Sequence, residues 1–185
     1  SNAAAGVVVA KVGTETVTRE ELRALAADGD GHRKVVTPRE LHKALRGERS
    51  RGRKIVFTNG CFDLFHAGHV SLLQFARSKG DVLVVGLNSD RSVHALKGDG
   101  RPILPQADRA RILSALEAVD YLVVFDEPTP AKLVRAIRPD VLIKGEDYAG
   151  KVVVGRENAG RVELAPLVEG RSTSEILRRI RGHGL

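Results

Sequence analysis

The sequence predicts an α/β protein in which helices cover both faces of a mostly parallel, five-stranded sheet. Short apolar runs alternate along the chain with helical segments of about 8 to 12 residues, an alternation typical of parallel sheets. Aromatic residues make up only 4% of the chain, so the core must be built from valine, leucine, isoleucine and alanine. Those residues suit strands that are buried on both faces. Hydrophobic residues make up 42% and charged residues 29% of the chain, a composition typical of a globular protein.

The elements are expected in a regular order. Thr37, Pro38 and Glu40 form a capping box with proline at the first helical position, and the helix they open should end near Arg49. Beyond it, strands are predicted over residues 55–58, 81–87, 121–125, 141–143 and 161–165. Helices are predicted over residues 68–78, 107–118, 130–138 and 172–181, with a loop over 97–102. Residues 149–160 show no clear pattern.

Ligands of parallel sheets bind beyond the carboxyl ends of the strands. The loops that follow Thr58, Leu87, Phe125 and Ile143 are therefore where a functional site is expected.

The first 31 residues are predicted to lie outside the folded domain, which we expect to span residues 35–185. Ser1-Asn2-Ala3 is typical of a cleaved expression tag. Residues 28–31, Asp-Gly-Asp-Gly, form a break suited to a linker.

The net charge of +7 and the isoelectric point near 9.9 suit either nucleic acid or small polyanionic substrates. Basic residues are scattered, and the densest cluster, residues 46–54, lacks the aromatic side chains that a single-strand binder interleaves. We therefore expect phosphorylated small molecules as partners and no nucleic acid.

Cys61 is the only cysteine, which excludes an intrachain disulfide framework and a cysteine-based zinc site. No apolar run approaches the roughly 20 residues that a membrane-spanning helix needs. The apolar start is short and lacks a basic leader, so no signal peptide is predicted. We expect a cytoplasmic protein without membrane contacts.

The loop after the first strand carries the chemistry. Gly60 allows a sharp turn and a close approach of backbone N–H groups to a ligand, and the helix that follows presents an N-terminus that favours anions. His66 and His69 are three residues apart, so both imidazoles can lie on one side of the first helical turn, with Gly68 leaving room for a phosphate. Two such donors suit the charge that develops on a phosphate under in-line attack.

Other interpretations of this loop are weaker. Two histidines could bind zinc, but no cysteine or third histidine is obviously placed to complete the site. Cys61 could be a nucleophile, although a small buried thiol is the commoner role. Neither a Gly-x-Gly-x-x-Gly loop nor a Walker A sequence is present, which argues against a dinucleotide-binding dehydrogenase and a P-loop NTPase.

Residues 60–69, Gly-Cys-Phe-Asp-Leu-Phe-His-Ala-Gly-His, resemble the signature Gly-x-Phe-Asp-x-x-His-x-Gly-His of the cytidylyltransferase-like superfamily. The resemblance implies the Rossmann-like, three-layer HxGH nucleotidyltransferase fold. It also implies that His66 and His69 contact the phosphates of a nucleoside triphosphate and stabilise the transition state.

The resemblance extends over residues 35 to about 180 and implies roles for further residues. Implied catalytic residues are His66, His69 and Lys144. Implied nucleotide contacts are Thr58, Asn59, Gly60, Cys61, Phe62, Gly68, Asn88, Asp90, Lys97, Arg109, Gly145, Ser172, Thr173 and Ser174. Mg²⁺ is implied as a cofactor that bridges phosphate oxygens, and the sequence reveals no dedicated protein ligand for it.

The amino-acid sequences around these residues are similar to those of heptose 1-phosphate adenylyltransferases. Such enzymes form the C-terminal half of bifunctional heptose kinase/adenylyltransferases. That branch implies transfer of AMP from ATP to D-glycero-D-manno-heptose 1-phosphate, a homodimer, and fusion to a sugar kinase. Residues 4–14 resemble the closing segment of a ribokinase-like kinase.

Two alternatives stay open. One is a CTP-dependent cytidylyltransferase that acts on glycerol 3-phosphate or a similar phosphorylated alcohol. It stays open because Glu146 and Arg171 differ from the residues common at these positions among relatives, which leaves the acceptor undecided. The other is a non-catalytic module that binds nucleotide or nucleic acid on the same fold.

Overall fold

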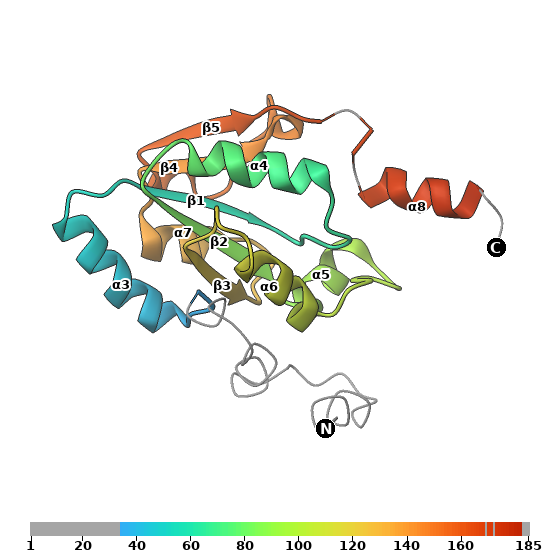
Figure 1. The fold of residues 1–185 in the computed structure, drawn as a ribbon, viewed down its shortest axis with the longest axis horizontal. Helices are drawn as coiled ribbons and strands as arrows, with labels where there is room; N and C mark the ends of the chain where they lie inside the picture. The colour runs from blue at the N-terminus through green and yellow to red at the C-terminus, as the bar shows by residue number, and fades with distance from the viewer. Residues whose placement is uncertain (1–33, 169, 172, 183–185) are drawn as a thin grey trace, which may run out of the picture.

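Figure 1 shows the computed structural model of the chain, which describes residues 34–168, 170–171 and 173–182. Its centre is a five-stranded sheet in the order β3-β2-β1-β4-β5, and every pair of neighbours is parallel. The strands are β1 (Ile55–Gly60), β2 (Val82–Asn88), β3 (Tyr121–Phe125), β4 (Val141–Gly145) and β5 (Arg161–Ala165). The predicted α/β fold with a parallel five-stranded sheet is confirmed.

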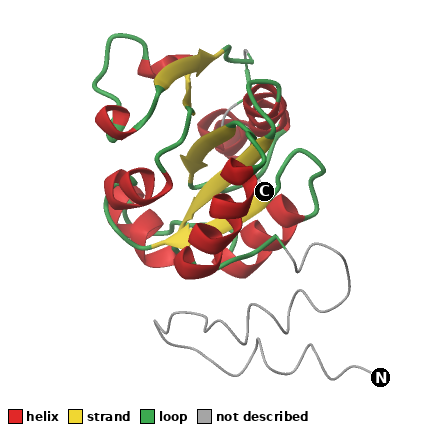
Figure 2. Cartoon of the chain, turned by 90° about the vertical axis from the view of Figure 1, so that its left-hand side faces the viewer, coloured by secondary structure: helices red, strands yellow, loops and turns green. Residues whose placement is uncertain are grey.

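Helices cover both faces of the sheet and give the predicted three layers (Figure 2). On one face lie α4 (Ala67–Arg77) and α6 (Gln106–Ser114), whose apolar side chains pack in one cluster with Val56 and Val85. On the other lie α3 (Pro38–Ser50) and α7 (Ala131–Ile137), which pack in a second cluster with Phe57 and Val84. Val56 and Phe57 are neighbours in β1 and point to opposite faces, so a strand with no exposed face reads as a continuous apolar run.

The capping box at the start of α3 is confirmed. The Thr37 side chain accepts from the Glu40 N–H, and the Glu40 carboxylate accepts from the Thr37 N–H at 2.9 Å. Just before this helix, Val35 forms a parallel bridge with Leu122 and extends the sheet beyond β3. Residues 1–33 lie outside the described residues, so the predicted division at residue 31 stays a prediction.

The strands that reach the site extend further towards it than predicted. β1 continues to Gly60, β2 to Asn88 and β4 to Gly145. The register pairs Gly60 with Leu87, so backbone hydrogen bonding carries the strands past their apolar runs. The residues at these strand ends are polar or glycine, so the apolar pattern used for prediction did not include them, although they take part in the hydrogen bonding of the sheet.

Helix α5 (Asp90–Lys97) was not predicted, and α6 is shorter than predicted. α5 is two turns long and buries only Ser92 and Val93, too little for an apolar period to show in the sequence. α6 ends at Ser114 because the chain must turn towards β3: Val119 is fully buried, and the Asp120 carboxylate accepts from the Leu83 N–H at 2.7 Å.

Two smaller elements also differ from expectation. Pro130 precedes α7 as its N-cap rather than opening the helix. The segment without a clear pattern, residues 149–160, contains the short 3₁₀ turn η3 (Arg156–Asn158), and a second such turn, η2 (Glu146–Tyr148), lies just before it.

The last helix, α8 (Thr173–Gly182), lies beyond the carboxyl ends of the strands (Figure 1). Within the described part of the chain, no helix is long and apolar enough to cross a membrane.

Candidate active site

A cavity of about 740 Å³ opens at the carboxyl ends of the strands, where the sequence predicted a site. It lies between the loop after β1, the ends of β2 and β4, and the start of α8. The predicted site residues that line it are Thr58, Asn59, Gly60, Cys61, Phe62, His66, Gly68, His69, Asn88, Lys97, Lys144, Gly145, Thr173 and Ser174. Ser172, also predicted to bind nucleotide, lies outside the described residues.

The loop between β1 and α4 is held in an unusual backbone conformation. Phe62 and Leu64 have φ angles of 50° and 49°, in the left-handed region that non-glycine residues seldom occupy. Burial holds this geometry, since Phe62 is 3% and Asp63 is 1% exposed. Strained, over-determined loops of this kind cluster at functional sites.

His66 and His69 form a stacked pair at the start of α4. His66 is the N-cap residue and His69 lies in the first turn, with ring centroids 3.9 Å apart and an angle of 22° between the rings. Phe62 and Phe65 flank His69, with ring centroids 5.2 and 5.4 Å from its own. The spacing of three residues therefore brings both imidazoles together.

Both histidines are neutral at pH 7. Burial, together with the smaller effects of the neighbouring His66 and Lys97, lowers the pKa of His69 to about 3, and burial also lowers the pKa of His66. Nδ1 of His69 accepts from the His66 backbone N–H at 3.4 Å, which leaves Nε2 of the neutral ring to carry the proton. Among the described residues, Nδ1 of His66 is buried without a hydrogen-bond partner. The pair can thus offer hydrogen bonds to an anion without carrying a full charge beforehand.

Lys144 lies at the end of β4 and is only 7% exposed. Its ammonium group donates to Oδ1 of Asn59 and lies 5.1 Å from the centre of the Tyr148 ring. Burial lowers the pKa of Lys144 to about 8, and the nearby Asp147 carboxylate partly offsets that effect. A desolvated cation held by a neutral amide is well suited to bind a phosphate.

Gly68 lets the chain before α8 approach α4. A Cβ atom at this position would lie 2.8 Å from the carbonyl oxygen of Arg171 and 3.0 Å from the His66 ring. The close approach brings the start of α8 near the histidine pair, and a helix N-terminus favours phosphate.

Replacing Gly68 by alanine is expected to weaken nucleotide binding about tenfold, because overpacking against backbone costs about 1–3 kcal/mol and each 1.4 kcal/mol is tenfold in affinity. Calorimetric titration with a non-hydrolysable ATP analogue measures the change. Gly47→Ala in α3 is the matched control, since its nearest atom is 4.0 Å away. That control should bind normally and gain up to about 1 kcal/mol of stability. Normal binding by Gly68→Ala would contradict the close approach.

The structure places Arg109 and Asp90 differently from the prediction, because neither lines the cavity. The Arg109 side chain is fully buried and donates to three carbonyl oxygens and to Oδ1 of Asp90. A position in the first turn of a helix could not reveal that the side chain points inward. From α6 the side chain reaches the carbonyl oxygens of Cys61 and Asn88, near the ends of β1 and β2.

Several lining residues were not predicted to contact ligand. They are Asp63, Leu72, Leu96, Pro128, Thr129, Pro130, Asp147, Tyr148, Val154, Ala165, Pro166, Leu167, Val168 and Arg171. The loop after Phe125 was expected near the site, so residues 128–130 could have been found from topology. Leu167 and Val168 follow an edge strand and carry no polar motif, so no sequence signal marked them. Within the described ranges, no group of three or more His, Cys, Asp or Glu side chains could hold a metal.

A stacked histidine pair, a buried lysine and a helix N-terminus at the carboxyl ends of a parallel sheet define the class of α/β nucleotidyltransferases. Comparison with known proteins agrees: residues 57–178 match the family model described as Cytidylyltransferase-like. The chain belongs to the cytidylyltransferase-like family, and it is a nucleotidyltransferase.

Curated relatives are similar over almost the whole chain. It is 54% identical to the "Bifunctional protein HldE" of Wolinella succinogenes over 98% of its length, and 51% identical to that of Citrifermentans bemidjiense over 97%. The chain spans only 39% and 38% of those two proteins. The resemblance to one half of a bifunctional protein is confirmed.

Among solved structures, a pantoate-beta-alanine ligase from Francisella tularensis, complexed with beta-gamma ATP and beta-alanine, superposes with a TM-score of 0.54. The two chains are 18% identical over 76% of this chain and 68% of the ligase. At that identity the likeness shows the shared fold alone.

Proposed function

We propose that the chain transfers AMP from ATP to D-glycero-D-manno-heptose 1-phosphate, giving ADP-heptose and pyrophosphate. The observation that carries the proposal is the stacked His66–His69 pair in one cavity with the buried Lys144 ammonium group. The similarity to bifunctional HldE proteins supports the choice of substrates.

The chemistry needs no covalent enzyme intermediate. An oxygen of the acceptor phosphate attacks the α-phosphorus of ATP, a new P–O bond forms, and the bond to the bridging oxygen breaks as pyrophosphate leaves. Catalysis is then a matter of orientation and charge stabilisation. In this proposal, the N–H groups of His66 and His69 and the ammonium group of Lys144 bind the phosphate oxygens on which negative charge builds up.

Mg²⁺ fits this cavity as an ion carried mainly by the substrate. Two carboxylates line the cavity, and that of Asp63 already accepts from backbone N–H groups, so Asp147 is the one placed to help hold a metal. Mg²⁺ binds few protein ligands when phosphates supply the others. When bound, it would neutralise charge on the phosphate oxygens.

The proposal extends to the protein's setting. We expect fusion to a sugar kinase in the full-length protein, in line with the 39% coverage of the HldE relative. We also expect a homodimer in the cytoplasm, with ATP and a sugar 1-phosphate as its partners and no nucleic acid.

Pyrophosphate release in the presence of Mg²⁺ tests the proposal. ATP and CTP are each combined with D-glycero-D-manno-heptose 1-phosphate and with glycerol 3-phosphate. We expect turnover only with ATP and the heptose phosphate. Turnover with CTP and glycerol 3-phosphate would replace the proposed substrates and keep the mechanism. Folded protein that turns over none of the four pairs would overturn the proposal.

A further inference from the structure

Two buried charged side chains, Asp63 in the wall of the cavity and Arg109 outside its lining, bind the backbone of the same residue, Leu104. The Leu104 N–H donates to Oδ1 of Asp63 at 3.0 Å, and its carbonyl oxygen accepts from Nε of Arg109 at 3.0 Å. The Ile103 N–H also donates to the Asp63 carboxylate, at 3.0 and 3.1 Å, and the Arg101 guanidinium lies 3.2 Å from it. We call Asp63 and Arg109 together the loop brace.

Arg109 connects this loop to the two central strands. Its Nη1 atom donates to the carbonyl oxygen of Cys61, just past the end of β1, at 2.7 Å, and to that of Asn88, the last residue of β2, at 2.8 Å. Nη2 donates to Oδ1 of Asp90 at 2.6 Å. Four of the five N–H donors of the guanidinium are therefore used on protein atoms.

Asp63 connects the same assembly to the last helix. Its carbonyl oxygen accepts from the Thr173 hydroxyl at 2.8 Å, at the first residue of α8. Cys61, Asn88 and Thr173 all line the cavity. The loop brace thus joins three parts of the cavity wall that are distant in sequence.

Both charges are shielded from solvent, with Asp63 and Arg109 each 1% exposed. A buried charge is tolerated only when its hydrogen-bonding capacity is used, and truncation of one partner leaves the other unpaired. Any other arrangement of these loops would expose Asp63 or Arg109 to solvent or leave one of them buried without its hydrogen-bond partners. The loop brace therefore selects one spacing of the strand ends.

We propose that Asp63 and Arg109 are positioning residues for nucleotidyl transfer, which fix the ends of β1 and β2 and the start of α8 relative to one another without touching substrate. The inference rests on the proposed function, because positioning is defined by a reaction. Its physical basis is that a misplacement of about 1 Å in a reacting assembly can cost about 100-fold in rate.

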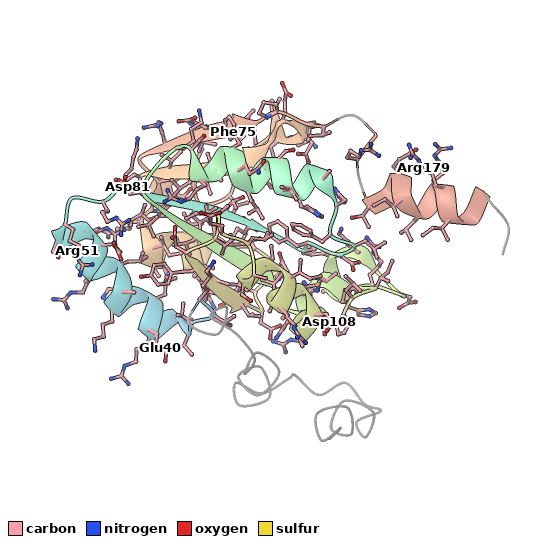
Figure 3. The ribbon with its side chains drawn as sticks, in the orientation of Figure 1. Glu40, Arg51, Phe75, Asp81, Asp108 and Arg179 are labelled. Atoms are coloured by element: carbon pink, nitrogen blue, oxygen red, sulfur yellow. The ribbon has the colours of Figure 1, made fainter. Side chains whose placement is uncertain are left out.

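Kinetics of Asp63→Asn and Arg109→Lys test the inference. Asparagine keeps only one carbonyl oxygen, and the ammonium group of lysine cannot reproduce the planar fork that reaches four acceptors. We expect kcat per folded molecule to fall about 30- to 100-fold, with KM for ATP within about threefold of wild type, because the Asp63 carbonyl that holds Thr173 is retained. The matched controls are Asp108→Asn and Arg111→Lys, on the same helix as Arg109 but exposed; Asp108 lies on the outside of the molecule in Figure 3. Both controls should keep wild-type kcat.

The double variant separates positioning by a shared unit from two independent effects. If both residues act through Leu104, Asp63→Asn combined with Arg109→Lys should lower kcat little more than the worse single variant. Single variants that lower the unfolding midpoint but keep kcat within about twofold of wild type would overturn the proposal, since a purely structural role predicts that result. So would fully multiplicative losses.

Hydrogen exchange of the wild-type protein supplies a readout that needs no variant and no turnover. The amide protons of Ile103 and Leu104 should exchange at least about 100-fold more slowly than those of the exposed residues 99 and 100. Equal exchange rates would overturn the loop brace even in an active enzyme. Slow exchange in a protein without turnover on any substrate pair would reject the proposed function and leave the loop brace standing.

Discussion

Replacing His69 by alanine is expected to lower kcat about 100- to 1000-fold, with a much smaller change in KM for ATP. Removal of one preorganised hydrogen-bond donor from a transition-state anion costs about that much. The partly buried, neutral ring of His69 is held by the His66 backbone and flanked by Phe62 and Phe65, so no reorganisation is needed when charge develops. Steady-state pyrophosphate release measures the loss.

The same experiment on other histidines shows whether the effect belongs to the pair. His66→Ala should lose a comparable factor, and the double variant should lose far less than the product of both, because stacked rings act on one group. His42→Ala is the control, since His42 is exposed on α3 far along the chain from the motif loop. A His69→Ala variant with kcat within threefold of wild type would remove the histidine pair from the mechanism.

The pH profile follows from the same burial. With its pKa lowered to about 3, His69 stays neutral throughout the range in which the protein is handled. We therefore expect no acid limb in kcat/KM, which reports the titration of the free enzyme, from this residue between pH 5 and pH 8. An activity that rises with pH through this range and flattens in the His69→Ala variant would show that the ring is protonated in the free enzyme.

The five parallel strands and the motif were predictable because both have strong local signals. Buried parallel strands leave continuous apolar runs, so all five strands were found, and β3 and β5 have the predicted bounds. The loop from Gly60 to His69 specifies its own geometry through glycine, a buried phenylalanine and a helix start. The carboxyl ends of parallel strands then meet at one edge, which brings Asn59, Asn88 and Lys144 into the cavity.

The features that were not predicted depend on the direction in which side chains point and on hydrogen bonds between residues distant in the sequence. Nothing in the sequence shows that Arg109 points into the interior and binds the Cys61, Asn88 and Leu104 carbonyl oxygens. Helix α5 has too small an apolar face to produce a periodic signal. Long-range hydrogen bonding to backbone carbonyls has no residue-type signature, since every residue carries a carbonyl oxygen.

Lys144→Met is expected to abolish most activity while it stabilises the fold. Burial lowers the pKa of Lys144 from 10.5 to about 8, which corresponds to a cost to the native state of about 3 kcal/mol at neutral pH. The unfolded chain binds this proton more tightly than the native protein. The cost is therefore fully present below pH 8 and fades as the pH rises from about 8 towards 10.5. Methionine fills a similar volume without a charge, so urea denaturation at pH 7 should show a gain of up to about 3 kcal/mol.

The activity of Lys144→Met should fall although its stability rises. The buried ammonium group destabilises the free protein because it is poorly solvated, and a poorly solvated cation binds a phosphate most strongly. We expect kcat/KM of Lys144→Met to fall about 100-fold at pH 7. In the wild type, kcat/KM should decline above pH 8 as the ammonium group loses its proton, and the variant should lack that decline. Lys151→Met is the matched control: Lys151 also lies over the Tyr148 ring, at 5.8 Å, but is exposed, and its replacement should change stability by less than about 0.5 kcal/mol. A Lys144→Met protein that is less stable than wild type at pH 7, or that keeps its activity, would show that the buried ammonium group is structural.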